Sequence, residues 1–271
     1  HPASLSLKIT TLLLTGLLAA CADRPLAPAV PAVPAVPVTA AAEALAPVPP
    51  EFIQCLADLQ PLALAAGISE SSWSTYTRDL RPDASVLARL DSQPEFKLPI
   101  WDYLSGLVDE ERIALGREKL TQHAELLAAI SQRYGVPAEA VVAIWGIESN
   151  FGETVGSNAL PTALATLSCA GRRQAFFRGE LFATLRILQA GDIQPERLRG
   201  SWAGAFGQAQ FMPSTFERLA VDFDGDGRRD LIDNTADALA SAANFLASSR
   251  WQRGLPWGFE VRLPAGFDSS N

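Results

Sequence analysis

Glu148 is the side chain of this sequence best suited to acid/base chemistry. It lies in the sequence WGIESNFG at residues 145–152, where apolar residues surround the carboxyl group. Apolar surroundings disfavour the ionised form of a carboxylic acid and therefore raise its pKa. A glutamic acid that is still protonated near neutral pH can donate its proton to a glycosidic oxygen, as in general acid catalysis of the lysozyme kind. The alternative is a glutamate that only caps or pairs at a helix end.

The residues before Glu148 are predicted to form a helix that begins at Pro137. Proline is tolerated in the first turn of a helix, and Ile144 falls on the same face as Glu148 at helical spacing. Asn150 and Gly152 are residue types that end helices, which puts Glu148 in the last turn. The negative end of the helix dipole lies there and favours the protonated acid further.

A glycine-rich loop with amide and aromatic side chains follows at residues 200–212, and we call it the glutamine loop. Its sequence is GSWAGAFGQAQFM. The small residues would let a ligand approach the backbone closely, and the loop offers polar side chains suited to sugar hydroxyl and N-acetyl groups, namely Ser201, Gln208 and Gln210. Aromatic faces for stacking on sugar rings come from Trp202, Phe206 and Phe211. The alternative is a loop buried between core helices.

These two segments, followed in order by PWGFEVRLP at residues 256–264, resemble the lytic murein transglycosylase B family. The similarity runs through most of residues 51–271. It implies a mainly α (α+β), lysozyme-like fold with Glu148 as the sole catalytic acid/base. It also implies that peptidoglycan glycan strands are the partner, bound by Ser149, Asn150, Ser201, Gln208, Gln210 and Phe211. Gln208 stands at a position that varies in the family.

A single carboxyl group fits the reaction that this resemblance implies. Ordinary glycosidases use two carboxylates about 5 to 10 Å apart, and the sequence offers no obvious second one beside Glu148. We expect Glu148 to protonate the β-1,4 bond between N-acetylmuramic acid and N-acetylglucosamine. The muramyl 6-hydroxyl would then close a 1,6-anhydro ring without consuming water. The alternatives are a hydrolytic muramidase and a non-catalytic peptidoglycan-binding lipoprotein.

A run of aspartates at residues 222–233, the acidic loop, matches the calcium pattern of an EF-hand. Its sequence DFDGDGRRDLID has carboxylates at positions 1, 3, 5, 9 and 12 and glycine at position 6. The expected ligands are Asp222, Asp224, Asp226, Arg228 and Asp233. Asp233 replaces the usual longer glutamate, and the family resemblance favours Asp237 in its place. We expect a structural calcium ion and no organic cofactor; the alternative is a metal-free acidic turn.

The N-terminal segment predicts export and lipidation. Lys8 precedes an apolar run at residues 12–18, and the sequence LAAC at residues 18–21 resembles a lipoprotein processing box. Residues 1–20 would be the signal peptide, Cys21 the lipidated residue, and residues 21–50 a Pro/Ala-rich linker. We therefore expect a lipid anchor on the periplasmic face of a Gram-negative outer membrane, with other cell-wall enzymes as further partners. The alternative is an ordinary cleavage site with an incidental cysteine.

Composition predicts one globular domain over residues 51–271. The chain has 271 residues, 48% of them apolar, which is enough for one sizeable core. A net charge of −8 without a basic cluster excludes nucleic acid as a partner. Family members usually continue beyond the last motif, so we expect this chain to be truncated at its C-terminus.

The periodicity of apolar residues predicts helices and one strand. Helices are expected at residues 51–66, 70–80, 109–133, 174–190 and 213–220, with a further helix after the acidic loop and a strand at residues 259–263. Because thiols oxidise in exported proteins, a disulfide is expected between Cys55 in the first helix and Cys169 downstream of Glu148.

Overall fold

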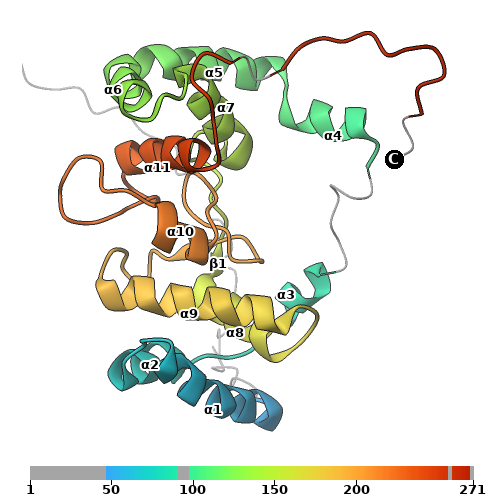
Figure 1. Cartoon of the computed structure of the whole chain (residues 1–271). Coiled ribbons are helices and arrows are strands. Elements are labelled where there is room, and N and C mark those ends of the chain that lie inside the picture. Colours follow the sequence, from blue (N-terminus) through green and yellow to red (C-terminus); the bar gives the residue numbers. More distant parts are fainter. Residues whose placement is uncertain (1–46, 91–97, 256–257, 269–271) are drawn as a thin grey trace, which may run out of the picture. The chain divides into compact units, whose positions relative to one another are not determined.

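The computed structural model describes residues 47–90, 98–255 and 258–268, and these residues are mainly helical (Figure 1). The helices are α1 (Pro50–Ala65), α2 (Glu70–Thr77), α3 (Ala84–Arg89), α4 (Ile100–Leu107), α5 (Glu110–Gln122), α6 (Ala124–Tyr134), α7 (Ala138–Ser149), α8 (Leu160–Cys169), α9 (Gln174–Ala190), α10 (Pro213–Leu219) and α11 (Thr235–Ser248). Two short strands, β1 (Asn158–Ala159) and β2 (Arg199–Gly200), pair antiparallel. The predicted mainly α fold is confirmed. The predicted signal peptide, Cys21 and most of the linker lie outside the described residues.

Two clusters of buried apolar side chains form the core. The first joins α1, α2 and α3 to α8, α9 and α10, and α8 packs along α9 (Figure 1). The second joins α6, α7 and α11. Helix α11 contributes to both clusters, because Ala238 packs in the first and Leu239 in the second. Helix α7 belongs to the second cluster, whereas the glutamine loop places Phe206 and Phe211 in the first.

The single helix predicted at residues 109–133 is wrong, because the structure has two helices there. The break falls at His123, whose backbone angles (φ −109°, ψ 24°) are not helical. Its ring packs edge-on against Trp145, with 5.4 Å between the ring centroids. A contact with a residue of α7 therefore accompanies the break, and periodicity within the segment could not reveal it.

The strand predicted at residues 259–263 is also wrong, because these residues form neither strand nor helix. The apolar residues alternate as expected, but Phe259 is 80% exposed and Val261 70% exposed. No segment within the described ranges pairs with them, and an unpaired strand leaves its backbone hydrogen bonds unmade. Conversely, α3, α4 and α8 are helices that the periodicity did not predict.

A disulfide joins Cys55 of α1 to Cys169 at the end of α8, with 5.7 Å between the Cα atoms. It links residues 114 positions apart and ties the N-terminal helix to the end of a helix in the first core cluster. No helix within the described ranges has both the length and the apolar character needed to cross a membrane.

Candidate active site

Glu148 lies in the last turn of α7, at a sharp reversal of the chain. Asn150 ends the helix in the left-handed conformation (φ 48°, ψ 53°), and Phe151 follows at φ 58°. The reversal folds the ring of Phe151 back onto α7 beside Trp145, with 5.6 Å between the ring centroids. Only a glycine fits beneath this ring, because a Cβ atom at Gly146 would lie 2.7 Å from Phe151 Cζ.

The surroundings of the Glu148 carboxyl group shift its pKa upward. The residue as a whole is exposed, yet partial burial of the carboxyl group raises its pKa above the ordinary value. This is the direction that the sequence predicts, and burial is its cause. A raised pKa makes the protonated form of this carboxyl group more favourable than in a free glutamate.

Ser149 connects α7 to the glutamine loop. It is only 1% exposed. Its hydroxyl group donates a hydrogen bond to the Gln208 carbonyl oxygen at 2.6 Å and accepts one from the Gly152 backbone N–H at 3.0 Å. This side chain therefore fixes the end of the helix that carries Glu148 against the loop that carries Gln210.

Gln208 extends this connection to the acidic loop. Its backbone N–H donates to the Leu231 carbonyl oxygen at 2.7 Å, and its side-chain amide donates to the Ile232 carbonyl oxygen at 3.1 Å. Gln208 is 6% exposed, as is Phe211, whose ring packs beside that of Phe245. Three of the six side chains predicted to bind substrate, Ser149, Gln208 and Phe211, are thus buried in contacts within the protein.

The other three predicted binding residues are partly exposed. Asn150 Nδ2 donates to Glu153 Oε2 at 2.9 Å, so the acid nearest to Glu148 in the sequence is paired with Asn150. Ser201 Oγ accepts from the Ala205 backbone N–H at 3.0 Å. Gln210, in the left-handed region at φ 48°, donates through Nε2 to the Val155 carbonyl oxygen at 3.2 Å. Within the described part of the chain, its Oε1 atom accepts no hydrogen bond.

At two glycines of the glutamine loop, other backbone atoms of the protein occupy the space that a side chain would need. A Cβ atom at Gly200 would lie 2.2 Å from the Ala205 carbonyl oxygen, and one at Gly207 would lie 2.6 Å from the Leu231 carbonyl oxygen. At these two positions the packing of the chain itself requires glycine, as the alternative of a loop packed against the core predicts. Access of a ligand to the loop stays a prediction.

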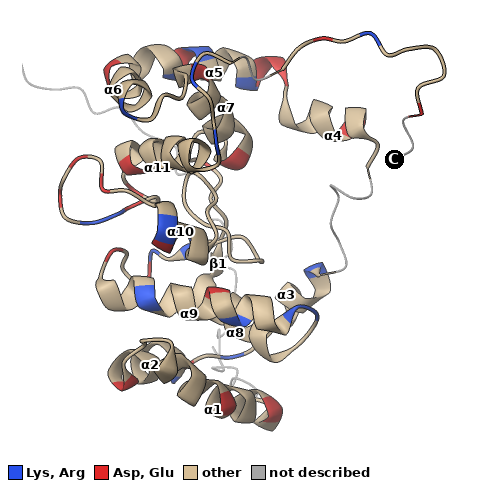
Figure 2. Cartoon of the chain, in the orientation of Figure 1, with Lys and Arg blue, Asp and Glu red and all other residues tan. Residues whose placement is uncertain are grey.

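The acidic loop, between α10 and α11, carries acidic (red) and basic (blue) residues (Figure 2). Oxygen atoms of Asp222, Asp224 and Asp237 lie within 4.8 Å of one another. Asp237 is fully buried, and this burial raises its pKa, as do the charges of Asp224 and Asp222. Its two oxygens accept hydrogen bonds from the backbone of Phe223 and Asp230. An all-oxygen cluster of like charges suits a hard cation such as calcium.

The remaining predicted metal ligands do not belong to this cluster. Asp233, at position 12, pairs with Arg197, whose Nε atom lies 2.9 Å from Asp233 Oδ2. Asp226 instead accepts a hydrogen bond from the Arg228 backbone N–H at 2.8 Å. The carboxylate cluster therefore contains Asp222, Asp224 and Asp237 of the predicted ligands and does not contain Asp226 or Asp233. The ligand assignment from the EF-hand pattern stays a prediction.

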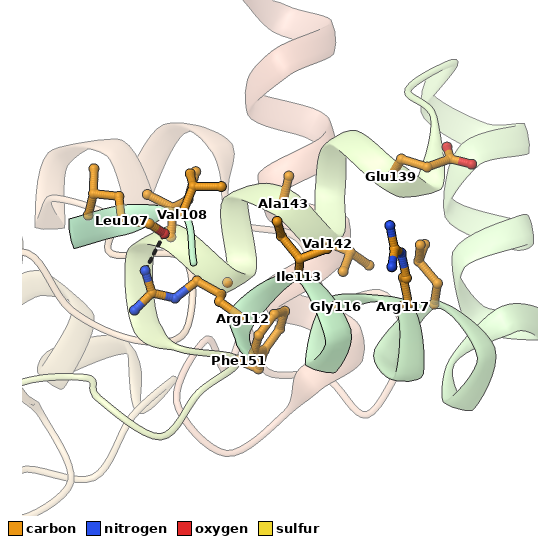
Figure 3. Close-up of a pocket in the computed structure, with 13 residues that line it drawn as sticks. Leu107, Val108, Arg112, Ile113, Gly116, Arg117, Glu139, Val142, Ala143 and Phe151 are labelled. Carbon is orange, nitrogen blue, oxygen red and sulfur yellow. Dashed lines mark hydrogen bonds between the residues drawn. The ribbon is translucent and has the colours of Figure 1, made fainter. Parts of the chain in front are cut away.

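An apolar pocket of about 200 Å³ lies between α5 and α7 (Figure 3). Val142 and Phe151 line it from the α7 side and Ile113 from α5, while Arg112 is held at its edge by a hydrogen bond to the Leu107 carbonyl oxygen. Glu148 is not among its lining residues. Because the pocket lies on a different face of α7, it is not the site of acid chemistry.

Comparison with known proteins gives consistent matches. Residues 51–271 match the family described as Transglycosylase SLT domain. Membrane-bound lytic murein transglycosylase B of Escherichia coli (strain K12) is 38% identical over 171 residues, which cover 61% of this chain and 47% of that protein.

Solved structures agree with this match. SltB3 from Pseudomonas aeruginosa, in complex with NAG-NAM-pentapeptide, has a TM-score of 0.76 and 49% identity, covering 80% of this chain and 58% of that one. The Escherichia coli lytic transglycosylase Slt35, in complex with calcium, has a TM-score of 0.66 and 32% identity, covering 76% and 64%. The chain thus spans about half the length of the first relatives that it matches.

Proposed function

This chain belongs to the Transglycosylase SLT family, and on that premise we propose that it is a lytic transglycosylase acting on peptidoglycan. It cleaves the β-1,4 bond between N-acetylmuramic acid and N-acetylglucosamine and leaves a 1,6-anhydro-N-acetylmuramic acid end. The observation that carries the proposal is the position of Glu148 in the last turn of α7, next to Ser149, which bonds to the glutamine loop, together with the burial that raises its pKa.

Glu148 acts first as an acid and then as a base. The protonated carboxyl group donates its proton to the glycosidic oxygen, so the bond from that oxygen to the anomeric carbon breaks and N-acetylglucosamine leaves as an alcohol. The N-acetyl group of the muramyl residue stabilises the cationic carbon. The Glu148 carboxylate then takes the proton of the 6-hydroxyl as its oxygen bonds to that carbon. The proton is restored to Glu148, and no water is consumed.

The neighbouring side chains divide into two roles under this proposal. Asn150, Ser201 and Gln210 are partly exposed and bind the glycan, with Gln210 Oε1 as a hydrogen-bond acceptor. The buried side chains of Ser149, Gln208 and Phe211 position these residues and Glu148 without touching substrate.

The complexes of the relatives support the proposed substrate and product. SltB3 from Pseudomonas aeruginosa was solved with NAG-NAM-pentapeptide and with NAG-anhNAM-pentapeptide. The second ligand has the anhydro end that the product of the proposed reaction would have, and the first does not. The activity of the present chain is a proposal because it covers only about half of such proteins.

Digestion of purified peptidoglycan sacculi, read by mass spectrometry, tests the proposal. The expected products end in anhydro-muramic acid and are lighter by one water than hydrolytic products. Glu148→Gln should abolish their release, whereas Glu125→Gln, the same change at an exposed position of α6, should not. Reducing ends would instead indicate a hydrolytic muramidase. Retained binding to sacculi without any product from the unmodified chain would indicate a non-catalytic lipoprotein.

We propose that a calcium ion binds to Asp222, Asp224 and Asp237 and acts structurally. An ion can reach Asp222 and Asp224 from solvent, because both side chains are at least partly exposed. The Asp237 carboxylate is held in place by hydrogen bonds from two backbone N–H groups. The complex of Slt35 with calcium supports the choice of ion. Because Gln208 is hydrogen-bonded to the end of the acidic loop, the ion would stabilise the loop that carries Gln210.

We propose a location in the Gram-negative cell envelope, with residues 51–271 as the catalytic domain, residues 1–20 as signal peptide and residues 21–50 as linker. The apolar run before Cys21 supports export, and the relative from Escherichia coli is described as membrane-bound. A lipid anchor on Cys21 predicts incorporation of radioactive palmitate. If Cys21→Ser retained the label, the anchor would be excluded.

A further inference from the structure

A short segment at residues 154–158, which we call the crossing segment, leads from the end of α7 to β1 and lies against the glutamine loop. At its start, the Thr154 backbone N–H donates a hydrogen bond to the Ser149 carbonyl oxygen in the last turn of α7, at 2.8 Å. At its end, Asn158 pairs with Gly200 in the antiparallel pair of β1 and β2. The crossing segment therefore connects the helix that carries the proposed acid to the start of the glutamine loop.

The backbones of the crossing segment and the glutamine loop meet at Gly156. A Cβ atom at this position would lie 2.2 Å from the Gly200 carbonyl carbon and 2.6 Å from the Ser201 backbone nitrogen. The left-handed backbone of Gly156 (φ 89°) also favours glycine. Because no side chain separates the two backbones, the position of the crossing segment determines the position of the peptide bond that precedes Ser201.

Hydrogen bonds from side chains hold the same contact from both sides. Asn158 Nδ2 donates to the Gly200 carbonyl oxygen at 3.2 Å, and Arg199 Nη1 donates to the Ser157 carbonyl oxygen at 2.9 Å. The first of these bonds comes from a side chain of the crossing segment itself. A substitution of Asn158 can therefore remove a contact with the glutamine loop without changing the backbone of either segment.

The crossing segment contacts two of the three partly exposed residues that we propose bind the glycan. Gln210 Nε2 donates to the Val155 carbonyl oxygen at 3.2 Å, and Gly156 lies against the backbone of Ser201. Ser201 then holds its own turn, because its backbone N–H donates to the Ala205 carbonyl oxygen at 2.7 Å and its Oγ atom accepts from the Ala205 N–H at 3.0 Å. One short segment thus positions both residues relative to the end of α7.

We propose that the crossing segment sets the distance between Glu148 and the glycan-binding residues of the glutamine loop, and that Asn158 is a positioning residue for the reaction. The proposal rests on the proposed function, because it assumes that Ser201 and Gln210 hold the glycan. Asn158 does not touch the substrate and acts through the Gly200 carbonyl oxygen. Proton donation needs the glycosidic oxygen within hydrogen-bond reach of the acid, and a displacement of about 1 Å already lowers the rate strongly.

Kinetics of Asn158→Ala on soluble peptidoglycan strands test this role. The value of kcat should fall by about tenfold, because the bound glycan is displaced from Glu148. The value of KM should stay within about twofold of that of the unmodified chain, because Ser201 and Gln210 still bind the glycan. Asn158→Asp keeps the size of the side chain but loses the N–H donor, so its kcat should fall at least as far. An unchanged kcat, or a loss confined to KM, would overturn the proposal.

Asn244→Ala is the matched control. Asn244 of α11 is partly buried like Asn158, and its Nδ2 atom also donates to a backbone carbonyl oxygen, that of Leu219 in α10, at 2.9 Å. Each variant loses one such hydrogen bond, so both should lower Tm by about 2 to 4 °C. Only Asn158→Ala should lower kcat. An equal loss of kcat in both variants would mean that Asn158 merely stabilises the fold.

Hydrogen–deuterium exchange separates a failure of the positioning role from a failure of the proposed function. In Asn158→Ala, the backbone amides of Ser201 and Ala205 should exchange faster than in the unmodified chain, because their turn loses a contact that holds it. In Asn244→Ala, they should exchange at the unmodified rate. If the unmodified chain released no anhydro products, the proposed function would fail while this measurement still decided whether Asn158 holds the loop. Unchanged exchange in Asn158→Ala would refute the positioning role whatever the turnover.

Discussion

The glutamine loop and the acidic loop lie in contact, yet they are stabilised in different ways. In the glutamine loop, uncharged groups form hydrogen bonds with one another. The Ser149 hydroxyl group donates to the Gln208 carbonyl oxygen, and the Gln208 side-chain amide donates to the Ile232 carbonyl oxygen of the acidic loop. In the second, Asp222, Asp224 and Asp237 bring like charges together, which raises the pKa of Asp237 beyond the effect of burial. The contacts of Ser149 and Gln208 need no ligand, whereas the repulsion among the three carboxylates would be relieved by a bound cation.

Hydrogen bonds through Gln208 connect the acidic loop to the end of the helix that carries Glu148. Gln208 donates from its backbone to Leu231 and from its side chain to Ile232, both at the end of the acidic loop. Its own carbonyl oxygen accepts from Ser149, the residue after Glu148. Order in the acidic loop should therefore affect the position of the Glu148 carboxyl group.

The largest expected effect comes from closing the space where the two loops touch. In Gly207→Ala, the new Cβ atom would lie 2.6 Å from the Leu231 carbonyl oxygen at φ 73°, so the free energy of unfolding should fall by about 3 kcal/mol. Gly225→Ala in the acidic loop shares the left-handed backbone (φ 80°) but meets nothing within 4 Å, and should lose about 1 kcal/mol. Urea unfolding measures both. Equal losses would mean that the contact does not matter.

Calcium should stabilise the acidic loop and, through it, the whole domain. At a free ion concentration of about 100 times Kd, linkage gives about 2.7 kcal/mol of added stability, visible as a higher Tm. Asp224→Asn should remove most of this gain, whereas Asp226→Asn should retain it because Asp226 lies outside the carboxylate cluster. Calorimetry with calcium checks the binding itself. No heat at millimolar ion would exclude the site, and equal effects of both variants would restore the EF-hand assignment.

Removing the Ser149 hydroxyl group should weaken the glutamine loop without touching substrate. Ser149→Ala leaves the buried Gln208 carbonyl oxygen and Gly152 N–H without their partner, a loss of about 2 kcal/mol. Ser168→Ala is the matched control, since Ser168 is also buried but bonds only to the Leu164 carbonyl oxygen of its own helix. Thermal unfolding and kcat should both fall more for Ser149→Ala. Indistinguishable variants would contradict a positioning role.

The smallest expected effect is the pH dependence that Glu148 adds to stability. Because burial raises its pKa in the folded state, the folded protein retains a proton that the unfolded chain has lost. Stability therefore falls as pH rises from the ordinary glutamate pKa through the raised one. Glu148→Gln stays neutral, so it should be slightly more stable than the unmodified chain above this range and equally stable below it. Melting curves at both ends of the range measure the difference, and a pH-independent difference would contradict the raised pKa.

Local patterns sufficed for the sequence to predict several elements. Pro137 and Asn150 bound α7 as their residue types indicate, and the periodicity of residues 174–190 matches α9. Periodicity failed where a distant residue decides the conformation, as at His123, whose ring packs on Trp145. It also missed α8, most of whose residues are buried, chiefly against α9.

The same distinction between local patterns and long-range contacts applies to the candidate site. Residue type and spacing determined that Glu148 ends a helix in apolar surroundings and that a polar, glycine-rich loop follows. Only the tertiary structure decided that the Ser149 hydroxyl group bonds to the Gln208 carbonyl oxygen, that other parts of the chain pack against the loop glycines, and that Asp222, Asp224 and Asp237 form one carboxylate cluster. The physical reason is that caps and helical faces arise from neighbours along the chain, whereas hydrogen-bond partners and charge clusters depend on which distant segments the two cores bring together.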